Sequence, residues 1–367
     1  MNNISRRQFC GYVGACTSSL FLQDYIIAAD SIFKSKCPNI ILIMISDLGY
    51  GELGCYNNPD INTPCIDALA VSGTRFTDFH SSGPVGSVTW SSVLTGLYPQ
   101  RFGPAAAMAS NHRCDEPLLT TTFLDLLKAS GYQEKIITQT NHGSIDTLTR
   151  QSVDFIRQSE TPFCLLISNS LSVDNNYSFK KRLKSIDQSI GEITSALMHL
   201  QNEQNTFIFF FSGGGSNRNI NNSLRGSKGS LWEGGHRVPA IACWPGRIKA
   251  NSVSNQLSIT LDIFPTVLAA ANVKLSRNNA IDGINLLPFL TEYKFPYERN
   301  LFWSYSGSRS IRQGKWKLIL NRFGEDKGLY LFNLDEDISE KVNLFYTKQD
   351  IAKKISKLTK TSIFELM

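Results

Sequence analysis

The sequence has little charge, and no motif in it concentrates that charge. Of its 367 residues, 19% are charged and 42% are hydrophobic, and the formal net charge is +6. The basic residues are spread along the chain, apart from the short run Lys180-Lys181-Arg182, which falls on an expected helix as a solvated face. A nucleic-acid-binding stripe needs a larger basic cluster. The composition therefore indicates a globular protein with a large core and no nucleic-acid partner.

Zinc-binding spacings are also lacking. Eight cysteines occur, and none of them forms a CxxC pair or accompanies paired histidines, so we expect no zinc site. Cys164 and Cys243 lie in apolar runs and are predicted to be buried thiols. Four histidines show no ligand spacing either and are expected to be surface or packed residues: His80, His112, His199 and His236.

The first residues have the pattern of an export signal. Ser5-Arg6-Arg7-Gln8-Phe9 has the form of a twin-arginine motif, and the apolar stretch from Gly11 to Leu22 is too short to span a bilayer. We interpret residues 1–29, which end in Ala28-Ala29, as a twin-arginine-type signal peptide. The mature chain is then expected in the periplasm or outside a bacterial cell, without a membrane span. A chance arginine pair and a lipoprotein signal at Cys16 are the alternatives.

Three continuous apolar runs predict strands that are buried on both faces, at residues 40–45, 163–167 and 207–211. Between the last two, apolar residues recur at spacings of three and four from Leu183 to Leu200, which predicts a helix. Strand, helix and strand in this order indicate a right-handed crossover. The predicted fold class is α/β, with a mostly parallel mixed sheet between helices.

Such sheets bind ligands beyond the carboxyl ends of their strands. The residues in those positions are Ser46-Asp47, Ser168-Asn169 and the run from Ser212 to Gly215. We therefore expect the functional site to lie at this edge of the sheet.

The C-terminal part has a different pattern. Short strand-like pieces separated by turns occur at residues 301–305, 310–312, 316–320 and 329–332, and a charged amphipathic helix follows at about 349–359. This pattern predicts a small antiparallel sheet with one helix. We expect an α/β domain at residues 37–297 and an α+β subdomain at residues 298–367.

Long segments of the chain resemble sulfatases of the alkaline phosphatase superfamily. The similar segments follow the order of that family over nearly all of the mature chain, and they are residues 38–56, 62–70, 73–79, 94–99, 224–235, 262–266 and 314–319. The resemblance implies the alkaline phosphatase-like fold and hydrolysis of sulfate esters.

The resemblance also implies a nucleophile that this chain lacks. Sulfatases make a formylglycine from the Cys of a Cys-x-Pro-x-Arg motif. In the matching segment, Gly86 has the Cys position, Val88 the Pro position and Trp90 the Arg position. Gly86 has no side chain to oxidise, and Trp90 removes a cation that would steady the nucleophile. We therefore expect catalysis to be impaired.

The calcium site that the resemblance implies is similarly depleted. Two adjacent Asp residues of the family correspond to Ser46 and Asp47, and a later Asp-Asn pair corresponds to Gly213 and Gly214. Calcium takes about six to eight oxygen ligands. We expect no tightly bound cofactor, with weak cation binding through Asp47 left open. Asp47 is alternatively a polar cap beyond its strand.

One cationic position of the family is retained. The Lys-x-His of the family aligns with Gln139 and Asn141, although a shift by one residue places His142 there, and another family His aligns with Ser172. Lys228 matches outright and is predicted to hold an anion. It could equally be a solvated lysine in a loop whose glycines set the backbone.

Three functional hypotheses follow. The first is an exported, catalytically impaired protein that binds a sulfated or otherwise anionic glycan through Lys228, Arg101, His142 and backbone donors, or that binds a protein partner instead. The second is an active sulfate or phosphate ester hydrolase that uses Ser87 or Thr89, although a hydroxyl needs a base or a metal for activation. The third is a decaying gene product without a role.

Ser87 also has a structural interpretation. It could cap the helix that is expected to run to Gly96, since a serine oxygen accepts a hydrogen bond from the first turn of a helix.

Overall fold

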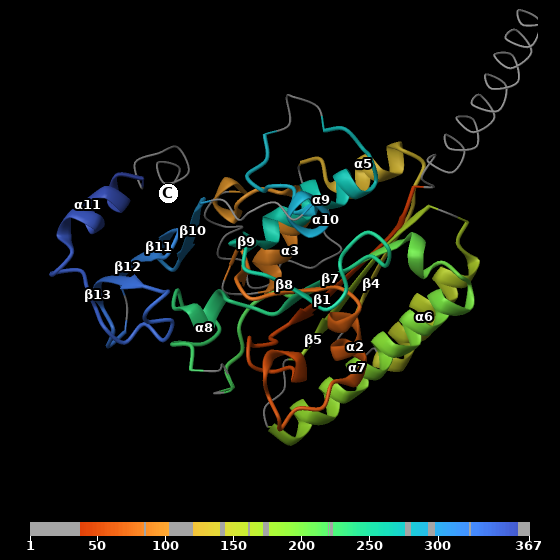
Figure 1. The fold of residues 1–367 in the computed structure, drawn as a ribbon, viewed down its shortest axis with the longest axis horizontal. Coiled ribbons are helices and arrows are strands. Elements are labelled where there is room, and N and C mark those ends of the chain that lie inside the picture. Colours follow the sequence, from red (N-terminus) through yellow and green to blue (C-terminus); the bar gives the residue numbers. More distant parts are fainter. Residues whose placement is uncertain are drawn as a thin grey trace, which may run out of the picture. The chain divides into compact units, whose positions relative to one another are not determined.

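The computed structural model shows a large and a smaller β-sheet, together with a two-stranded sheet of β3 (Phe79–His80) and β9 (Ser258–Ile259), and helices around them (Figure 1). From Pro38 onward the described residues belong to one compact unit. Within these residues, no helix combines the length and the apolar character that a membrane span requires. The structure describes residues 37–83, 86–102, 120–139, 144–160, 162–171, 176–218, 220, 223–275, 280–292, 298–322 and 324–358.

The large sheet has seven strands in the order β4-β5-β1-β6-β7-β2-β8. Strands β4, β5, β1 and β6 are parallel, and β7 runs antiparallel to both of its neighbours. This arrangement confirms the predicted α/β class and the three predicted strands. The bounds are β1 (Asn39–Ser46), β2 (Thr74–Phe76), β4 (Gln133–Thr138), β5 (Phe163–Ser170), β6 (Thr206–Ser212), β7 (Ala240–Cys243) and β8 (Ser252–Ser254).

Strand β1 explains why the centre of this sheet is apolar on both faces. Its side chains alternate, because successive residues of a strand point to opposite faces. Ile40, Leu42 and Met44 enter one core, whereas Ile41, Ile43 and Ile45 enter the other. Cys164 on β5 and Cys243 on β7 are buried in these cores, as predicted.

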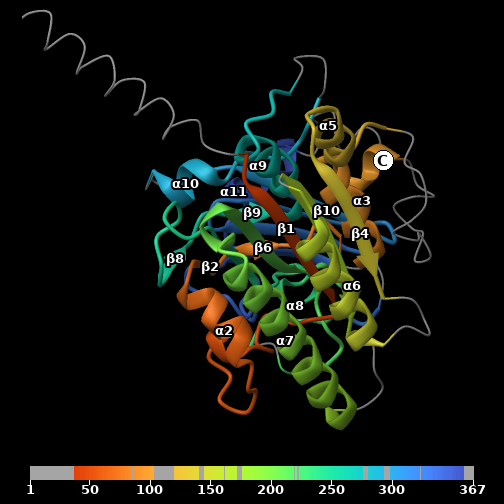
Figure 2. The same ribbon diagram turned by 90° about the vertical axis from the view of Figure 1, so that its right-hand side faces the viewer.

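Helices cover both faces of the sheet (Figure 2). The predicted long helix is α7 (Asn176–His199), and it packs against α6 (Ile145–Gln158) and α2 (Pro64–Val71) over one face. The other face is covered by α3 (Gly86–Thr95), α5 (Phe123–Ala129), α9 (Ile263–Ala270) and α10 (Leu287–Thr291).

The second sheet is antiparallel and confirms the predicted C-terminal architecture. Its strands pair in chain order, and the helix α11 (Gln349–Lys357) packs on it. Their core includes Trp303 and Ile355 together with Leu231 and Leu261 from the main part of the chain. The division into two domains stays a prediction, since both sheets lie in one compact unit. The strands are β10 (Asn300–Tyr305), β11 (Ser308–Gln313), β12 (Trp316–Asn321) and β13 (Gly328–Asn333).

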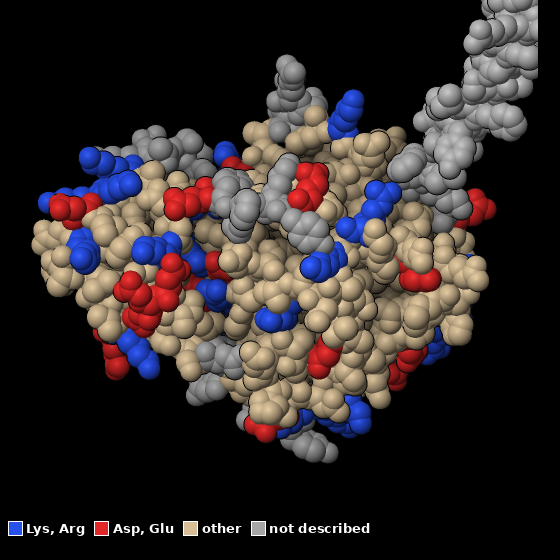
Figure 3. All heavy atoms as spheres, in the orientation of Figure 1, with Lys and Arg blue, Asp and Glu red and all other residues tan. Residues whose placement is uncertain are grey.

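Short elements complete the fold. They are β3 (Phe79–His80), β9 (Ser258–Ile259), α8 (Glu233–His236), and the 3-10 turns η1 (Gly54–Tyr56), η2 (Pro99–Phe102), η3 (Glu203–Asn205) and η4 (Thr260–Asp262). On the face shown in Figure 3, the described Lys and Arg side chains are interspersed with Asp and Glu rather than gathered in one stripe.

Candidate functional site

The carboxyl ends of β1 and β6 meet the start of α3. Ser46 is the last residue of β1, Gly213 follows β6, and Gly86 begins α3. A Cβ atom added to Gly86 would lie 2.5 Å from Ser46 Oγ and 3.1 Å from Ser46 Cβ. A Cβ added to Gly213 would lie 3.4 Å from Gly86 Cα and 3.4 Å from Ser46 Oγ. The fold therefore brings together three of the positions at which the sequence analysis placed the site.

Lys228 and Asp47 form an ion pair beside this junction. Lys228 Nζ lies 2.6 Å from Asp47 Oδ1, and the Lys228 side chain is 30% exposed whereas that of Asp47 is 9% exposed. The backbone N–H of Lys228 donates to the Ser216 carbonyl at 3.2 Å, which ties the lysine loop to the loop after β6. The carboxylate that was expected to bind a cation is thus neutralised by the lysine that was expected to bind an anion.

A second cation, Arg218, contacts the backbone of Asp47 just after β1. It donates to both carboxylate oxygens of Glu52 at 2.9 Å, to the Leu171 carbonyl at 3.2 Å and to the Asp47 carbonyl. Its guanidinium stands 4.0 Å from the ring centre of Phe179. The sequence analysis missed Arg218, because no motif or spacing connects it to Glu52, which is 166 residues away.

Glycines shape the loop that carries Lys228. Gly226 has φ +79°, a backbone conformation that side chains disfavour. A Cβ atom on Gly234 would clash with the Gly226 carbonyl oxygen. The loop therefore folds back on itself at Gly226 and packs without room for side chains there.

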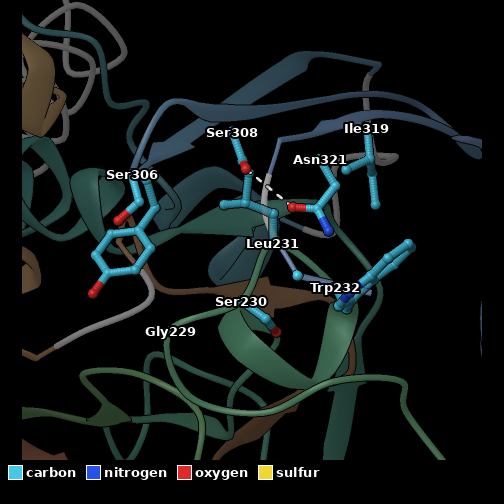
Figure 4. A pocket seen from close by; sticks show the side chains of 10 residues that line it. Gly229, Ser230, Leu231, Trp232, Ser306, Ser308, Ile319 and Asn321 are labelled. Carbon is cyan, nitrogen blue, oxygen red and sulfur yellow. Dashed lines mark hydrogen bonds between the residues drawn. The ribbon is translucent and has the colours of Figure 1, made fainter. Parts of the chain in front are cut away.

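A pocket of about 540 Å³ lies beside the lysine loop, between the loop and the C-terminal sheet (Figure 4). Tyr305 is half-buried at its side, close to Gly229, while Ser308 Oγ donates to Asn321 Oδ1 at 3.0 Å. The pocket therefore combines aromatic side chains with hydroxyl and amide groups. The residues that line the pocket are Gly229, Ser230, Leu231, Trp232, Tyr305, Ser306, Ser308, Ile319, Asn321 and Gly324.

Arg101 has an acidic partner within the described residues. Its Nε and Nη2 donate to the two carboxylate oxygens of Asp282 at 2.7 and 2.6 Å. These hydrogen bonds raise the pKa of Arg101. Asp282 also accepts from the Tyr98 backbone N–H, so the pair fixes the turn after α3. The structure does not describe His142 or Ser172.

The hydroxyl residues at the start of α3 are placed differently from each other. Thr89 is fully buried, and its hydroxyl donates to the Gly83 carbonyl at 3.4 Å. Since α3 begins at Gly86, Ser87 lies inside its first turn, and the expectation that Ser87 precedes and caps the helix is wrong. The Ser87 side chain is outside the described part of the chain.

A buried polar cluster, which the sequence analysis did not assemble, links β3 and α8 to the C-terminal sheet. Donor atoms of His80, Glu233 and His236 lie within 4.8 Å of one another, a spacing that a metal ion could use. However, Lys317 Nζ from β12 lies 2.9 Å from Glu233 Oε1, 3.0 Å from His236 Nε2 and 2.9 Å from Glu340 Oε1. The ammonium donates to Glu233 Oε1 and His236 Nε2 and forms an ion pair with Glu340, so a cation already lies among these ligand atoms.

The two histidines form a hydrogen-bond chain from Lys317 to Asp78. An ammonium can only donate, so His236 Nε2 accepts from it. His236 Nδ1 lies 2.9 Å from His80 Nδ1, and His80 Nε2 lies 2.9 Å from Asp78 Oδ1 and 3.1 Å from Arg312 Nη1. Trp303 from β10 stacks on His236 with ring centres 4.2 Å apart. Both imidazoles are thereby held neutral between a cation and an anion.

Burial sets the protonation of this chain. It lowers the pKa of His80 and the pKa of His236, since desolvation disfavours the charged imidazolium. Burial alone would raise the pKa of Asp78, but the charges of Arg312 and Arg237 overcome it and hold the pKa of Asp78 below its usual range. Arg312 binds both oxygens of Asp78 at 2.6 and 2.7 Å, which anchors β11 to the segment between β2 and β3.

Comparisons with known proteins agree with this architecture. The family model described as Sulfatase matches residues 38–161 and 149–273, and the model of the C-terminal part of N-sulphoglucosamine sulphohydrolase matches residues 227–366. N-acetylgalactosamine-6-sulfatase of Rattus norvegicus is 28% identical over 404 residues, covering 83% of this chain and 77% of the relative.

Solved structures show the same fold. The structure of Ps i-CgsB in complex with k-i-k-neocarrahexaose superposes with a TM-score of 0.81 at 22% identity, covering 90% of this chain and 94% of the other. A 6S-sulfatase structure from the glycosaminoglycan locus of Bacteroides thetaiotaomicron gives a TM-score of 0.80 at 20% identity, covering 89% and 99% of the two chains.

Proposed function

The chain belongs to the sulfatase family, and from that premise we propose that it is an exported, catalytically impaired member that binds a sulfated or otherwise anionic glycan without cleaving it. The observation that carries the proposal is the contact at Gly86. The space for a nucleophilic side chain is filled by Ser46, whose Oγ lies 2.5 Å from where a Cβ of residue 86 would be. Sulfate transfer needs a nucleophile at that point.

The residues at the edge of the sheet do not fit the calcium ion on which sulfatases generally depend. Of the four aligned ligand positions, Gly213 and Gly214 lack side chains, and Ser46 offers a single hydroxyl. The carboxylate of Asp47 is paired with Lys228. A calcium ion takes about six to eight oxygen ligands, and this donor set falls well short of that number. We derive no catalytic step through calcium.

Anion binding is the chemistry that these residues support. Lys228 is the cation of the intact family loop, and its side chain is 30% exposed. The helix α3 starts at Gly86, which lies at the same junction, and the N-terminus of a helix favours negative charge. Tyr305 and the hydroxyl groups of the neighbouring pocket suit a sugar ring.

No described contact favours the alternative of an active ester hydrolase. Thr89 is buried, and its hydroxyl donates to the Gly83 carbonyl. Export rests on the twin-arginine pattern of residues 1–29, which lie outside the described part of the chain.

A binding comparison tests the proposal. The mature protein is titrated calorimetrically with N-acetylgalactosamine 6-sulfate and with sulfated neocarrahexaose, beside their desulfated counterparts. These are the sugars that the names of two similar proteins contain. We expect the sulfated forms to bind, and we expect Lys228→Met to weaken that binding. Equal affinity for sulfated and desulfated sugars would show that the site does not recognise anions.

A further inference from the structure

Arg182 is a cation held at the carboxyl ends of two neighbouring strands. It projects from α7, where its Nε donates to the Ser170 carbonyl at 2.6 Å and its Nη2 donates to Gln139 Oε1 at 2.5 Å. Ser170 is the last residue of β5, and Gln139 follows β4, where its N–H donates to the Ser168 carbonyl at 3.0 Å. Two strands therefore fix the guanidinium at the edge of the sheet where the candidate site lies.

The charge of Arg182 is not balanced by an acid among the described residues. Both of its oxygen partners are neutral, and its Nη1 has no partner in the part of the chain that the structure describes. Burial lowers the pKa of Arg182, whereas the ion pair with Asp282 raises the pKa of Arg101. A half-buried guanidinium without a counter-ion is costly, and an anionic ligand would offset that cost.

Arg182 is one strand away from the lysine site. Ser170 pairs with Ser46 in the register of β5 and β1, and neighbouring strands lie about 4.8 Å apart. The next residue, Leu171, donates its N–H to the Ser46 carbonyl at 2.9 Å. A single oligosaccharide can therefore span the guanidinium of Arg182 and the ammonium of Lys228.

We infer that Arg182 binds a second anionic group of the ligand, which makes that ligand a saccharide with at least two sulfate half-esters. Arg182 supplies this charge from the helix α7, beside the side-chain amide of Gln139. Arginine suits the role because its planar fork binds the oxygens of a sulfate in pairs. The inference rests on the proposed function, since it assigns a second anchor for the same ligand.

Three variants test the role of Arg182 by calorimetric titration with neocarrahexaose. Arg182→Gln keeps a hydrogen-bonding side chain but removes the charge, and we expect at least tenfold weaker binding, the size of a lost charge-assisted hydrogen bond. Arg182→Lys keeps the charge without the fork, and its affinity is expected between those of the wild type and Arg182→Gln. Lys181→Gln, at the exposed neighbouring residue, is the matched control and is expected to change affinity less than twofold.

The salt dependence of binding separates a binding role from a structural one. Fewer ionic contacts make binding less sensitive to salt, so Arg182→Gln is expected to have a shallower salt dependence of binding than Lys181→Gln. Equal affinities and slopes for these two variants would overturn the inference.

Inorganic sulfate distinguishes failure of this inference from failure of the proposed function. If the wild type binds no sulfated saccharide but sulfate raises its melting temperature more than that of Arg182→Gln, the proposed function is wrong and the anion site at Arg182 stands. If sulfate stabilises both proteins equally, Arg182 holds no anion and the inference is wrong as well.

Discussion

Lys228 Nζ lies 2.6 Å from Asp47 Oδ1, so the residue that was expected to bind an anion and the residue that was expected to bind a cation are bound to each other. The lysine comes from the loop before α8, and the aspartate follows β1 at φ +66°. The pair balances the carboxylate of Asp47 without a divalent ion. An anion that binds Lys228 must compete with an internal carboxylate.

Removing that competitor is predicted to strengthen anion binding. In Asp47→Asn the ammonium of Lys228 is released, and we expect the affinity for inorganic sulfate to rise about fivefold, the equivalent of about 1 kcal/mol for an ion pair of this kind. Isothermal titration of wild type and variant with sodium sulfate measures the change. Glu134→Gln is the matched control, because Glu134 pairs with Lys128 at 2.8 Å on the surface and its loss makes the same change in net charge. Equal affinity in both variants would show that Asp47 does not restrain Lys228.

The packing of Ser46 against position 86 is predicted to make the effects of substitutions at these two positions on the free energy of unfolding non-additive. Gly86→Ala adds a Cβ beside Ser46 and is expected to cost about 1–3 kcal/mol of unfolding free energy, as overpacked sites do. In a Ser46→Gly background the nearest atom is the Ser46 Cα at 4.0 Å, so most of that cost is expected to vanish. Denaturant unfolding of the four proteins gives the double-mutant cycle.

A graded control completes this cycle. Ser46→Ala removes the Oγ at 2.5 Å but keeps the Cβ at 3.1 Å, so it should relieve only part of the cost. Additive effects of the two substitutions would contradict the packing of Ser46 against residue 86.

Stability is predicted to fall as the pH drops below about 6.5. Burial lowers the pKa of His80 and His236 below their usual 6.5, so only the unfolded chain takes up these two protons, and up to about 2.7 kcal/mol of stability is lost per pH unit. Burial raises the pKa of Glu340 from 4.5 to about 7. Between pH 7 and pH 4.5 only the folded chain takes up this proton, so Glu340 increases the stability as the pH falls. The net loss between pH 6 and pH 5 is then about 1.4 kcal/mol per unit.

Urea unfolding at pH 7, 6 and 5 measures that slope. His236→Asn removes one of the two buried titrating groups and should flatten the dependence by about 1.4 kcal/mol per pH unit. His199→Asn, at the end of α7, is the control and should keep the wild-type slope. The same slope in both variants would mean that the buried histidines do not hold their neutral forms.

The sequence predicted the parts of the fold that are buried on both faces. Strands β1, β5 and β6 are continuous apolar runs. Strand β4 was not predicted, because only one of its residues is buried and several, including Gln133 and Lys135, are exposed. Strand β2 has only three residues, too few to show a period. Motif order placed Ser46, Gly86 and Gly213 at one edge, and the structure brings them into contact.

The partners of the cationic side chains could not be predicted in this way. Arg182 lies 43 residues from Gln139, and it was interpreted as part of a solvated basic face. Its direction toward the sheet follows from the packing of α7, which no local pattern records. The ion pair of Lys228 with Asp47 similarly depends on the approach of two loops that are distant in sequence.

Turnover is the most direct measure of the central claim. The purified mature protein is incubated with a panel of aryl sulfate and aryl phosphate esters, with and without added calcium, beside a Lys228→Ala control. The account predicts no turnover above that control in any condition, and no rise in melting temperature with calcium. Turnover that requires Lys228 or calcium would contradict it, and would mean that this edge of the sheet holds a working nucleophile.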